Sequence, residues 1–378
     1  MNKKLVGVIG AIITAAIITA AVITIIAVLT VDFENNNTIP LTTNPNLGLV
    51  VNTPTAATTL EELNRVYEQA ATTGVGRNNF YMFWNILEPE KDQFNFKESD
   101  VLMSFNKKNN MQVTLFFSVV NGPALGPFPD WMGRQALTED LADNTVRVLD
   151  VVLSRYNIID TVIIGAEIEE HFRYNEGGVE NYKHFFNIVY EKIKQKHPDV
   201  KIGSSFALHS IFNKNLENLV SELGMGDFVA FSYFPVDSLN DITKTPYEAQ
   251  TDLEKILDLV PDKKVALFEI SWSTSEFVNG NEQDQVEFLK TAYDFYRKNK
   301  SQIEFFTWYR QYDRPEGSCF PDKQESIESQ ITVGGGSGMG SSEFVIERLG
   351  YYLCNAGLVD VKGTPKPGWS EFKKQIQQ

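Results

Sequence analysis

Short apolar runs alternate with amphipathic stretches from Leu47 to Gln378, and this alternation constrains the fold more than any other feature. Short apolar runs bounded by polar segments are typical of buried strands, whereas apolar residues at helical spacing indicate helices. Strands that alternate with helices form parallel βαβ units. The predicted strands are Leu47–Val51, Asn79–Trp84, Gln112–Ser118, Thr161–Ile164, Lys201–Ser205, Phe228–Tyr233, Val265–Ile270 and Glu304–Tyr309.

The number of these units favours one α/β domain, a single (β/α)8 TIM barrel over residues 47–378. A doubly wound open sheet is the alternative. However, neither a GxGxxG nor a GxxxxGK[ST] phosphate-binding motif follows any predicted strand. We therefore expect a barrel whose helices include Leu60–Thr72, Asp100–Asn109, Thr145–Tyr156, Val179–Lys196, Asn215–Leu223, Pro246–Leu259 and Gln283–Asn299.

The N-terminal stretch from Leu5 to Val31 contains no charged residue over 27 positions. A helix of this length exceeds the ~30 Å hydrocarbon core of a bilayer. Lys3 and Lys4 precede it, which places the N-terminus in the cytoplasm. A cleaved signal peptide is the alternative, but its apolar region spans only about 7–15 residues. We expect a single-pass transmembrane anchor at 1–31, a linker rich in Asn, Thr and Pro at 32–46, and an extracytoplasmic domain at 47–378.

Charge and residue counts exclude several classes of function. The chain has 34 basic and 49 acidic residues, a net charge of −15, which argues against a nucleic-acid partner. Its four histidines are scattered and form no HExxH motif, so a histidine-rich metal site is not expected. Its two cysteines cannot form a cysteine-only zinc site. Outside the cytoplasm Cys319 and Cys354 can form a disulfide, although two separate thiols are the alternative.

Carboxylates follow two of the predicted strands directly. The fourth strand leads into Glu167, and the seventh leads into Glu269. Active groups of barrels lie at the C-terminal ends of strands, and a carboxylate there costs desolvation energy unless it is paired or used. Two carboxyl groups about 5–5.5 Å apart are the geometry of a retaining glycosidase. The alternative is that each glutamate pairs with a basic residue inside the barrel. Glu169 lies on the same face as Glu167 if the strand continues, and it is a second candidate for the acid.

Several passages in the same order along the chain resemble clan A glycoside hydrolases, in particular family 42 β-galactosidases and family 53 endo-β-1,4-galactanases. The Trp84–Phe96 passage is similar to their W-x-x-[IL]-E-P segment after strand two. The Gly165–Ile168 passage resembles their G-N-E-I acid/base segment. Further similar passages are Pro127–Trp131, Phe231–Pro235, Glu269–Trp272, Phe306–Trp308 and Gly357–Pro367.

This resemblance implies a retaining β-glycoside hydrolase that acts on oligo- or polysaccharide by double displacement. The expected anchor places that substrate outside the cytoplasm. By the resemblance, Glu269 is the nucleophile and Glu167 is the acid/base. Tyr233 is then expected to hydrogen-bond the nucleophile, and Trp308 to form the floor of the sugar subsite. This chemistry requires no metal and no organic cofactor.

Further residues are expected to contact the carbohydrate substrate. Trp84, Trp131 and Trp272 can stack on sugar faces, with core packing as the alternative. His209 follows strand five and can reach the site, and Glu169 can lie at its rim; a structural role is the alternative for both.

Two positions depart from the pattern of the clan. Ala166 stands where the clan has an asparagine that holds the sugar 2-hydroxyl, and Arg77 lies early for the expected basic residue of strand two. Hydrogen bonds to that hydroxyl contribute several kcal/mol in such enzymes. Ala166 therefore leaves open a non-catalytic glycan-binding barrel. A structural envelope protein that keeps the fold only for interactions is a third hypothesis.

Overall fold

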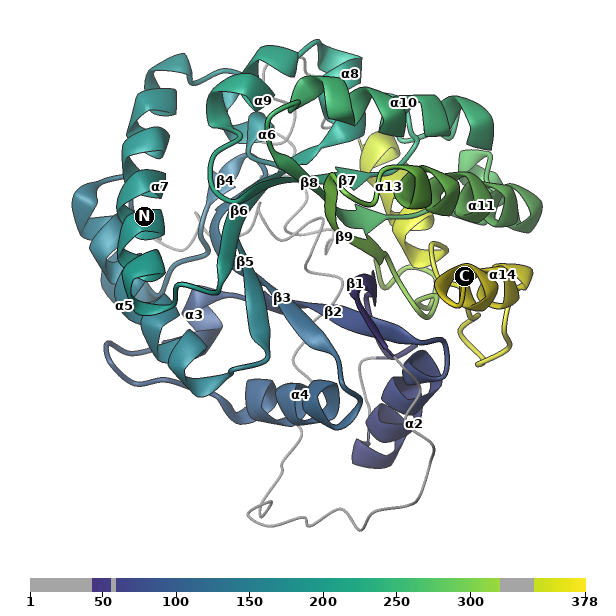
Figure 1. Cartoon of the computed structure of the whole chain (residues 1–378), viewed down its shortest axis with the longest axis horizontal. Coiled ribbons are helices and arrows are strands. Elements are labelled where there is room, and N and C mark those ends of the chain that lie inside the picture. Colours follow the sequence, from purple (N-terminus) through teal and green to yellow (C-terminus); the bar gives the residue numbers. More distant parts are fainter. Residues whose placement is uncertain (1–42, 56–58, 320–342) are drawn as a thin grey trace.

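The computed structural model describes residues 43–55, 59–319 and 343–378, and these form one (β/α)8 barrel (Figure 1). Eight parallel strands close into a ring in the order β1-β2-β3-β5-β6-β7-β8-β9 and back to β1. The short strand β4 pairs antiparallel with β3 beside the ring. The bounds are β1 Asn44–Leu49, β2 Val75–Met82, β3 Gln112–Asn121, β4 Ala124–Leu125, β5 Ile159–Ala166, β6 Lys201–Ala207, β7 Phe228–Tyr233, β8 Lys264–Ile270 and β9 Ile303–Trp308.

Helices surround the strands (Figure 1), and local sequence determines where several of them begin. The side chains of Thr59, Thr138 and Asn281 each accept a hydrogen bond from a first-turn backbone N–H. The α-helices are α2 Leu60–Ala71, α3 Trp84–Leu87, α4 Lys97–Lys108, α5 Glu139–Arg155, α6 Glu169–Phe172, α7 Glu176–Lys196, α8 Leu208–Lys214, α9 Glu217–Leu223, α10 Pro246–Leu259, α11 Glu282–Lys298, α13 Glu343–Cys354 and α14 Pro367–Ile376, and the short 3₁₀ turns are η1 Asp130–Met132 and η2 Glu276–Val278.

The strands are buried on both faces, as expected for a parallel sheet that helices cover. Strand β2 shows what each face contacts. Asn78 faces outward and donates a hydrogen bond to Asn106 of α4 at 3.1 Å. Arg77, Asn79 and Tyr81 alternate with it and face the interior of the barrel. Among these inward-facing residues, Arg77 therefore lies towards the N-terminal end of the barrel and Tyr81 towards its C-terminal end.

The predicted fold class is confirmed for the described residues, and the predicted domain boundary shifts slightly. Strand β1 begins at Asn44, so residues 44–46 belong to the barrel and not to the predicted linker. The expected anchor at 1–31 lies outside the described residues. Among the residues that are described, no helix is long and apolar enough to cross a membrane.

A disulfide bond joins Cys319, in the segment after β9, to Cys354 at the end of α13. The two Cα atoms are 5.6 Å apart. The bond holds α13 against the segment that follows the eighth barrel strand. It decides between the disulfide and the two separate thiols, which the sequence left open.

Arg77, the basic residue of β2, lies at the N-terminal end of the barrel. Its guanidinium donates to both carboxylate oxygens of Asp160, at 2.7 and 2.8 Å, and to Thr114 Oγ1 at 2.9 Å. Asp160 and Thr114 lie near the starts of β5 and β3. Arg77 therefore ties three strands together at the end opposite the predicted catalytic carboxylates, and its role is structural.

We expect the Arg77→Gln substitution to lower the free energy of unfolding by about 2–4 kcal/mol, because it breaks a bidentate ion pair whose arginine is buried. Urea denaturation followed by circular dichroism measures this loss. Arg65→Gln is the matched control, since Arg65 is 60% exposed and 4.0 Å from Glu62. That substitution should cost less than about 1 kcal/mol. Equal denaturation midpoints for the two variants would contradict the structural role of Arg77.

Candidate active site

Glu167 and Glu269 lie at the C-terminal end of the barrel, where the sequence predicted them. Glu167 directly follows β5, and Glu269 is the second-last residue of β8. Their side chains are buried, with 5% and 2% of their surface exposed. Glu167 adopts a left-handed backbone conformation with φ of 51°, which costs on the order of 1–3 kcal/mol for a residue other than glycine. A strained backbone that carries a buried carboxyl group is typical of a functional site.

The position of Ser232 shows that these two carboxyl groups lie on the same side of the barrel wall. Its Cα is the register partner of Glu269 between β7 and β8, so the two side chains project on the same face of the barrel wall. Its hydroxyl donates a hydrogen bond of 3.1 Å to Oε1 of Glu167. The backbone N–H of Glu167 also donates to the Ser205 hydroxyl of β6, at 3.4 Å. Strands β5 to β8 thus position both carboxyl groups.

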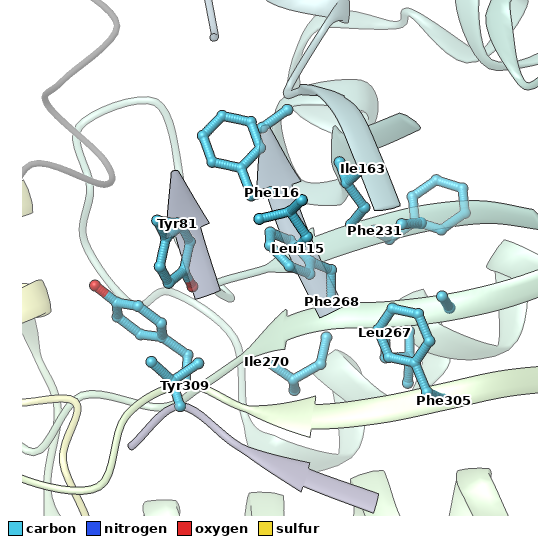
Figure 2. Close-up of a cluster of buried hydrophobic side chains, with 14 of the residues drawn as sticks. Tyr81, Leu115, Phe116, Ile163, Phe231, Leu267, Phe268, Ile270, Phe305 and Tyr309 are labelled. Atoms are coloured by element: carbon cyan, nitrogen blue, oxygen red, sulfur yellow. The ribbon is translucent and has the colours of Figure 1, made fainter. Parts of the chain in front are cut away.

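Glu269 has its own set of supporting groups. The Tyr81 hydroxyl from β2 donates a hydrogen bond to Oε1 of Glu269. Asn79 donates to the carbonyl oxygen of Phe268 at 2.8 Å and so fixes the backbone just before the glutamate. Figure 2 shows Tyr309, the residue after β9, beside Tyr81. The Arg310 guanidinium donates to the Tyr309 hydroxyl at 2.6 Å.

The surroundings of the two carboxyl groups give them different pKa values. Burial raises the pKa of Glu269 to about 7, while the Tyr81 hydrogen bond and the positive charge of Arg310 act to lower it. Burial raises the pKa of Glu167 to about 8, and the negative charge of Glu269 raises it further against the Ser232 hydrogen bond. Glu167 therefore holds a shared proton more strongly than Glu269 does.

The tyrosine that bonds Glu269 is not the one the sequence indicated. Tyr233 lies on the outer face of β7, and its hydroxyl donates to Oδ2 of Asp252 on α10 at 2.8 Å. Its ring packs against Phe288 of α11. The expectation that Tyr233 bonds the nucleophile is therefore wrong, because alternation along β7 turns it towards the helices.

Trp308 and Trp272 also lie between the barrel and its helices. Both indoles are fully buried, and both pack against Phe288 of α11, at ring-centroid distances of 6.0 and 5.3 Å. Trp308 shares its outward face with Phe306, which contacts Tyr293 of α11. The structure therefore replaces the expected sugar-stacking role of these two tryptophans with core packing. The aromatic residue on the inner side after β9 is Tyr309, one position later.

Trp84 and Trp131 surround the buried carboxylate of Glu88. Trp84 is fully buried against Phe117 and Phe128, and its Nε1 donates to Oε2 of Glu88 at 2.9 Å. Trp131 is partly exposed, and its Nε1 donates to the Glu88 carbonyl oxygen at 3.1 Å. Trp84 is thus a packing residue, whereas the contact of the partly exposed Trp131 with a sugar stays a prediction.

Glu169 and His209 lie on the β6 side of the two carboxyl groups. Glu169 is buried in α6, and its Oε1 accepts from the Ala207 N–H at 3.2 Å. Burial and the charges of Glu170 and Glu167 raise its pKa well above the usual value. His209 stacks on Phe234, and burial and then the Lys214 charge lower its pKa to about 4. His209 is therefore uncharged at neutral pH, and Glu169 is held by the backbone of β6.

Sequence reasoning missed three groups that act on the pair: Tyr81, Ser232 and Arg310. The signal that could have found Tyr81 is its alternation with Arg77 and Asn79 on β2. Ser232 is a hydroxyl inside an otherwise apolar strand, and Arg310 is a buried arginine just after a strand end. Within the part of the chain that the structure describes, no group of three or more His, Cys, Asp or Glu side chains is arranged to hold a metal ion.

Comparisons with known proteins identify the fold. No protein-family profile and no curated sequence matches the chain. A family 39 glycoside hydrolase from Bacteroides cellulosilyticus WH2 superposes with a TM-score of 0.57 at 15% identity, over 89% of this chain and 64% of that enzyme. This chain therefore spans less than two thirds of the length of the family 39 enzyme.

Two further structures agree with this result. A GH5_18 protein from Bifidobacterium longum subsp. longum, in complex with Manb1-4GlcNAc, gives a TM-score of 0.63 at 12% identity over 89% of this chain and 78% of that one. The β-glycosidase BGL167 gives 0.57 at 13% identity over 83% of this chain and 85% of that one. The chain therefore shares the (β/α)8 barrel fold of these glycoside hydrolases, and its likeness to clan A families 42 and 53 stays a prediction from sequence motifs.

The buried acid makes the stability of the barrel depend on pH. The pKa of Glu167 rises from 4.5 to about 8 on folding, so the folded state binds the extra proton between these values. Its contribution to stability is present below about pH 4.5 and is lost as the pH rises through 8. We expect Glu167→Gln to gain on the order of a few kcal/mol relative to wild type between pH 5 and pH 8.

Urea denaturation at both pH values measures this relative gain. Glu248→Gln is the control, because hydrogen bonds from Thr245 lower the pKa of Glu248 and it is ionised in both states above pH 5. Its stability difference from wild type should stay constant over the same interval. The same constant difference for Glu167→Gln would show that Glu167 is not held protonated in the folded barrel.

Proposed function

We propose that this protein is a retaining β-glycoside hydrolase in which Glu269 is the nucleophile and Glu167 is the acid/base. The single observation that carries the proposal is the pair of buried carboxyl groups at the ends of β5 and β8, with Ser232 bonded to Glu167 and paired in register with Glu269. One is supported as an anion by Tyr81 and Arg310, and the other is held as an acid. Opposed environments of two adjacent carboxyl groups are the signature of acid and nucleophile roles.

In the first step, a carboxylate oxygen of Glu269 attacks the anomeric carbon and the bond to the leaving-group oxygen breaks. The carboxyl group of Glu167 donates its proton to that oxygen, which leaves as an alcohol. Once the proton has left Glu167, the Glu269 carboxylate has become a neutral glycosyl ester. The negative charge therefore moves from Glu269 to Glu167, so the two carboxyl groups are not negatively charged at the same time.

In the second step, Glu167 accepts a proton from water as the water oxygen attacks the anomeric carbon. The bond to Glu269 breaks, its carboxylate is restored, and Glu167 is again an acid. Two inversions at the same carbon leave the product with the configuration of the substrate. The Tyr81 hydroxyl stabilises the carboxylate that departs in this step.

Ala166 favours a second candidate function, a glycan-binding barrel without turnover. It leaves the position before Glu167 without a polar side chain. Binding of a sugar without hydrolysis by the wild-type protein would support this reading.

We further propose that the barrel acts outside the cytoplasm, held by a transmembrane anchor at residues 1–31. The charge-free run from Leu5 to Val31 and the two lysines before it support this location. The Cys319–Cys354 disulfide also supports it, because disulfides persist in oxidising compartments. Protease treatment of intact cells should then remove the barrel from the membrane fraction.

The roles of the two glutamates can be separated by azide rescue on a panel of dinitrophenyl β-glycosides. In Glu269→Ala, azide replaces the nucleophile and attacks from the opposite face, so we expect an α-glycosyl azide. In Glu167→Ala, azide replaces water on the glycosyl-enzyme, so we expect a β-glycosyl azide. Nuclear magnetic resonance of the product distinguishes the two. Both variants should lose at least about 10³-fold in hydrolysis without azide.

Glu169→Gln is the control for the alternative acid and should retain hydrolysis within about tenfold, since Glu169 is held by the Ala207 N–H. Hydrolysis at the wild-type rate by both alanine variants would contradict the proposal. A 2-deoxy-2-fluoro glycosyl inactivator should add its sugar mass to the wild-type protein at Glu269. The adduct would also reveal the class of sugar.

Tyr81→Phe should move the acidic limb of the kcat/KM profile to higher pH. The Tyr81 hydrogen bond lowers the pKa of Glu269, so its loss raises that pKa and leaves less nucleophile ionised. A hydrogen bond to a charged group is worth about 1.5–3 kcal/mol, so kcat/KM should fall about 10- to 100-fold. Tyr233→Phe is the matched control and should leave the limb in place, because its hydroxyl bonds Asp252 outside the barrel. Identical profiles for the two variants would rule out the assigned role of Tyr81.

A further inference from the structure

We propose that Asn121, at the end of β3, holds the sugar hydroxyl next to the reacting carbon, in place of the amide that Ala166 lacks. This inference rests on the proposed function and deepens it by assigning a substrate-binding residue to the same site. The observations that carry it are the register of β3 and β5, the direction of the side chains, and a buried amide donor that has no partner among the described residues.

Asn121 and Ala166 are neighbours across two strands. They are register partners in the parallel pairing of β3 with β5, one step beyond the pair Val120 and Gly165. Register partners of adjacent parallel strands lie about 4.8 Å apart and project on the same face. The side chain of Asn121 therefore occupies the position next to that of Ala166, the residue directly before Glu167.

Contacts of the preceding pair show which face this is. A Cβ placed on Gly165 would lie 3.1 Å from the Tyr182 hydroxyl of α7 and 3.3 Å from the Val120 Cβ. Gly165 and Val120 thus face the helices. Since successive residues of a strand point to opposite sides, Ala166 and Asn121 face the interior of the barrel, where Ser232 and Glu269 also lie.

The amide of Asn121 has no partner for its donor. Its residue is only 4% exposed, and its Nδ2 makes no hydrogen bond within the described part of the chain. A buried donor without a partner costs about 1–3 kcal/mol. A donor kept at this cost beside a catalytic acid is explained if the substrate supplies the acceptor.

The surrounding backbone holds Asn121 in place. The Gly122 N–H donates to the Ala166 carbonyl oxygen at 2.8 Å. Nδ1 of His171 lies 3.0 Å from the Pro123 carbonyl oxygen and donates to it. The β3–β4 turn is therefore tied to β5 and to α6, so the amide is positioned before the substrate arrives.

The sugar atom that this donor reaches follows from the chemistry of the pair. Glu167 protonates the oxygen on the anomeric carbon, and the hydroxyl on the adjacent carbon is the 2-hydroxyl. Hydrogen bonds to this hydroxyl strengthen in the transition state of glycoside hydrolysis. In the glycoside hydrolases that this chain resembles, the residue directly before the acid/base supplies this donor. Here Asn121 supplies it from the neighbouring strand.

The test compares dinitrophenyl β-glucoside and β-galactoside with their 2-deoxy analogues, using wild type and Asn121→Ala. We expect kcat/KM of Asn121→Ala to fall at least about 10²-fold on the parent glycoside. On the 2-deoxy analogue, which lacks the hydroxyl, wild type and variant should agree within about threefold. Equal losses on both substrates, or no loss on either, would overturn the assignment.

Further variants keep the test decisive. Asn78→Ala removes a buried asparagine of the outer face and should affect both substrates alike. Asn121→Ala combined with Ala166→Asn returns an amide to the adjacent position and should recover the parent activity only. If Asn121→Ala does not fold, Asn121→Ser gives the same comparison. A wild type that hydrolyses none of the glycosides would instead refute the proposed function, and this inference would fall with it.

Discussion

The burial of two carboxyl groups beside one hydroxyl, that of Ser232, is the constraint on which the site depends. Each group loses water at its place in the barrel, and both cannot ionise together without a large electrostatic cost. The fold resolves this conflict by giving the two groups different neighbours. Glu269 receives a tyrosine donor and a nearby arginine, whereas Glu167 receives a serine and the charge of its partner. The same asymmetry that makes the pair tolerable in a folded protein also gives it the distribution of protons that double displacement requires.

Closure of the barrel is what brings these neighbours together. Tyr81 and Glu269 are 188 residues apart in the chain, yet they meet because closure leaves only β1 and β9 between β2 and β8 in the ring. The two ends of the barrel have different roles, one in stability and the other at the candidate site. Arg77 ties strand starts together at the N-terminal end, while the opposite end has a strained glutamate backbone and an amide donor without a partner in the described part of the chain. Stability at one end offsets the strain stored at the other.

The sequence allowed prediction of the elements but not of the direction of every side chain. Alternation of strands and helices sufficed for the barrel, and a glutamate after a buried strand sufficed to single out Glu167 and Glu269 as the candidate pair. The faces of Tyr233 and Trp308 could not be derived, because a shift of one residue turns a side chain from the interior to the helices. Strand β8 shifts its register against both neighbours near Glu269, and no local pattern announces such a shift. The predicted second strand started at Asn79, whereas β2 starts at Val75 and ends at Met82, so the alternation of Arg77, Asn79 and Tyr81 on one face was not recognised.

Ala166 shows why the absence of a residue from a motif does not establish the absence of its chemistry. A motif records positions along one strand, whereas a substrate meets groups by their position in space. In a parallel barrel the register partner of Ala166 lies as close to the end of β5 as the missing side chain would. An amide on the neighbouring strand can therefore reach the same substrate atom, provided that its backbone is held in place. The backbone of Asn121 is held by Gly122 and Pro123, and its donor has no partner within the described chain. In the sequence Ala166 argues against catalysis. The pairing of β3 with β5 shows that Asn121 can supply the amide that Ala166 lacks.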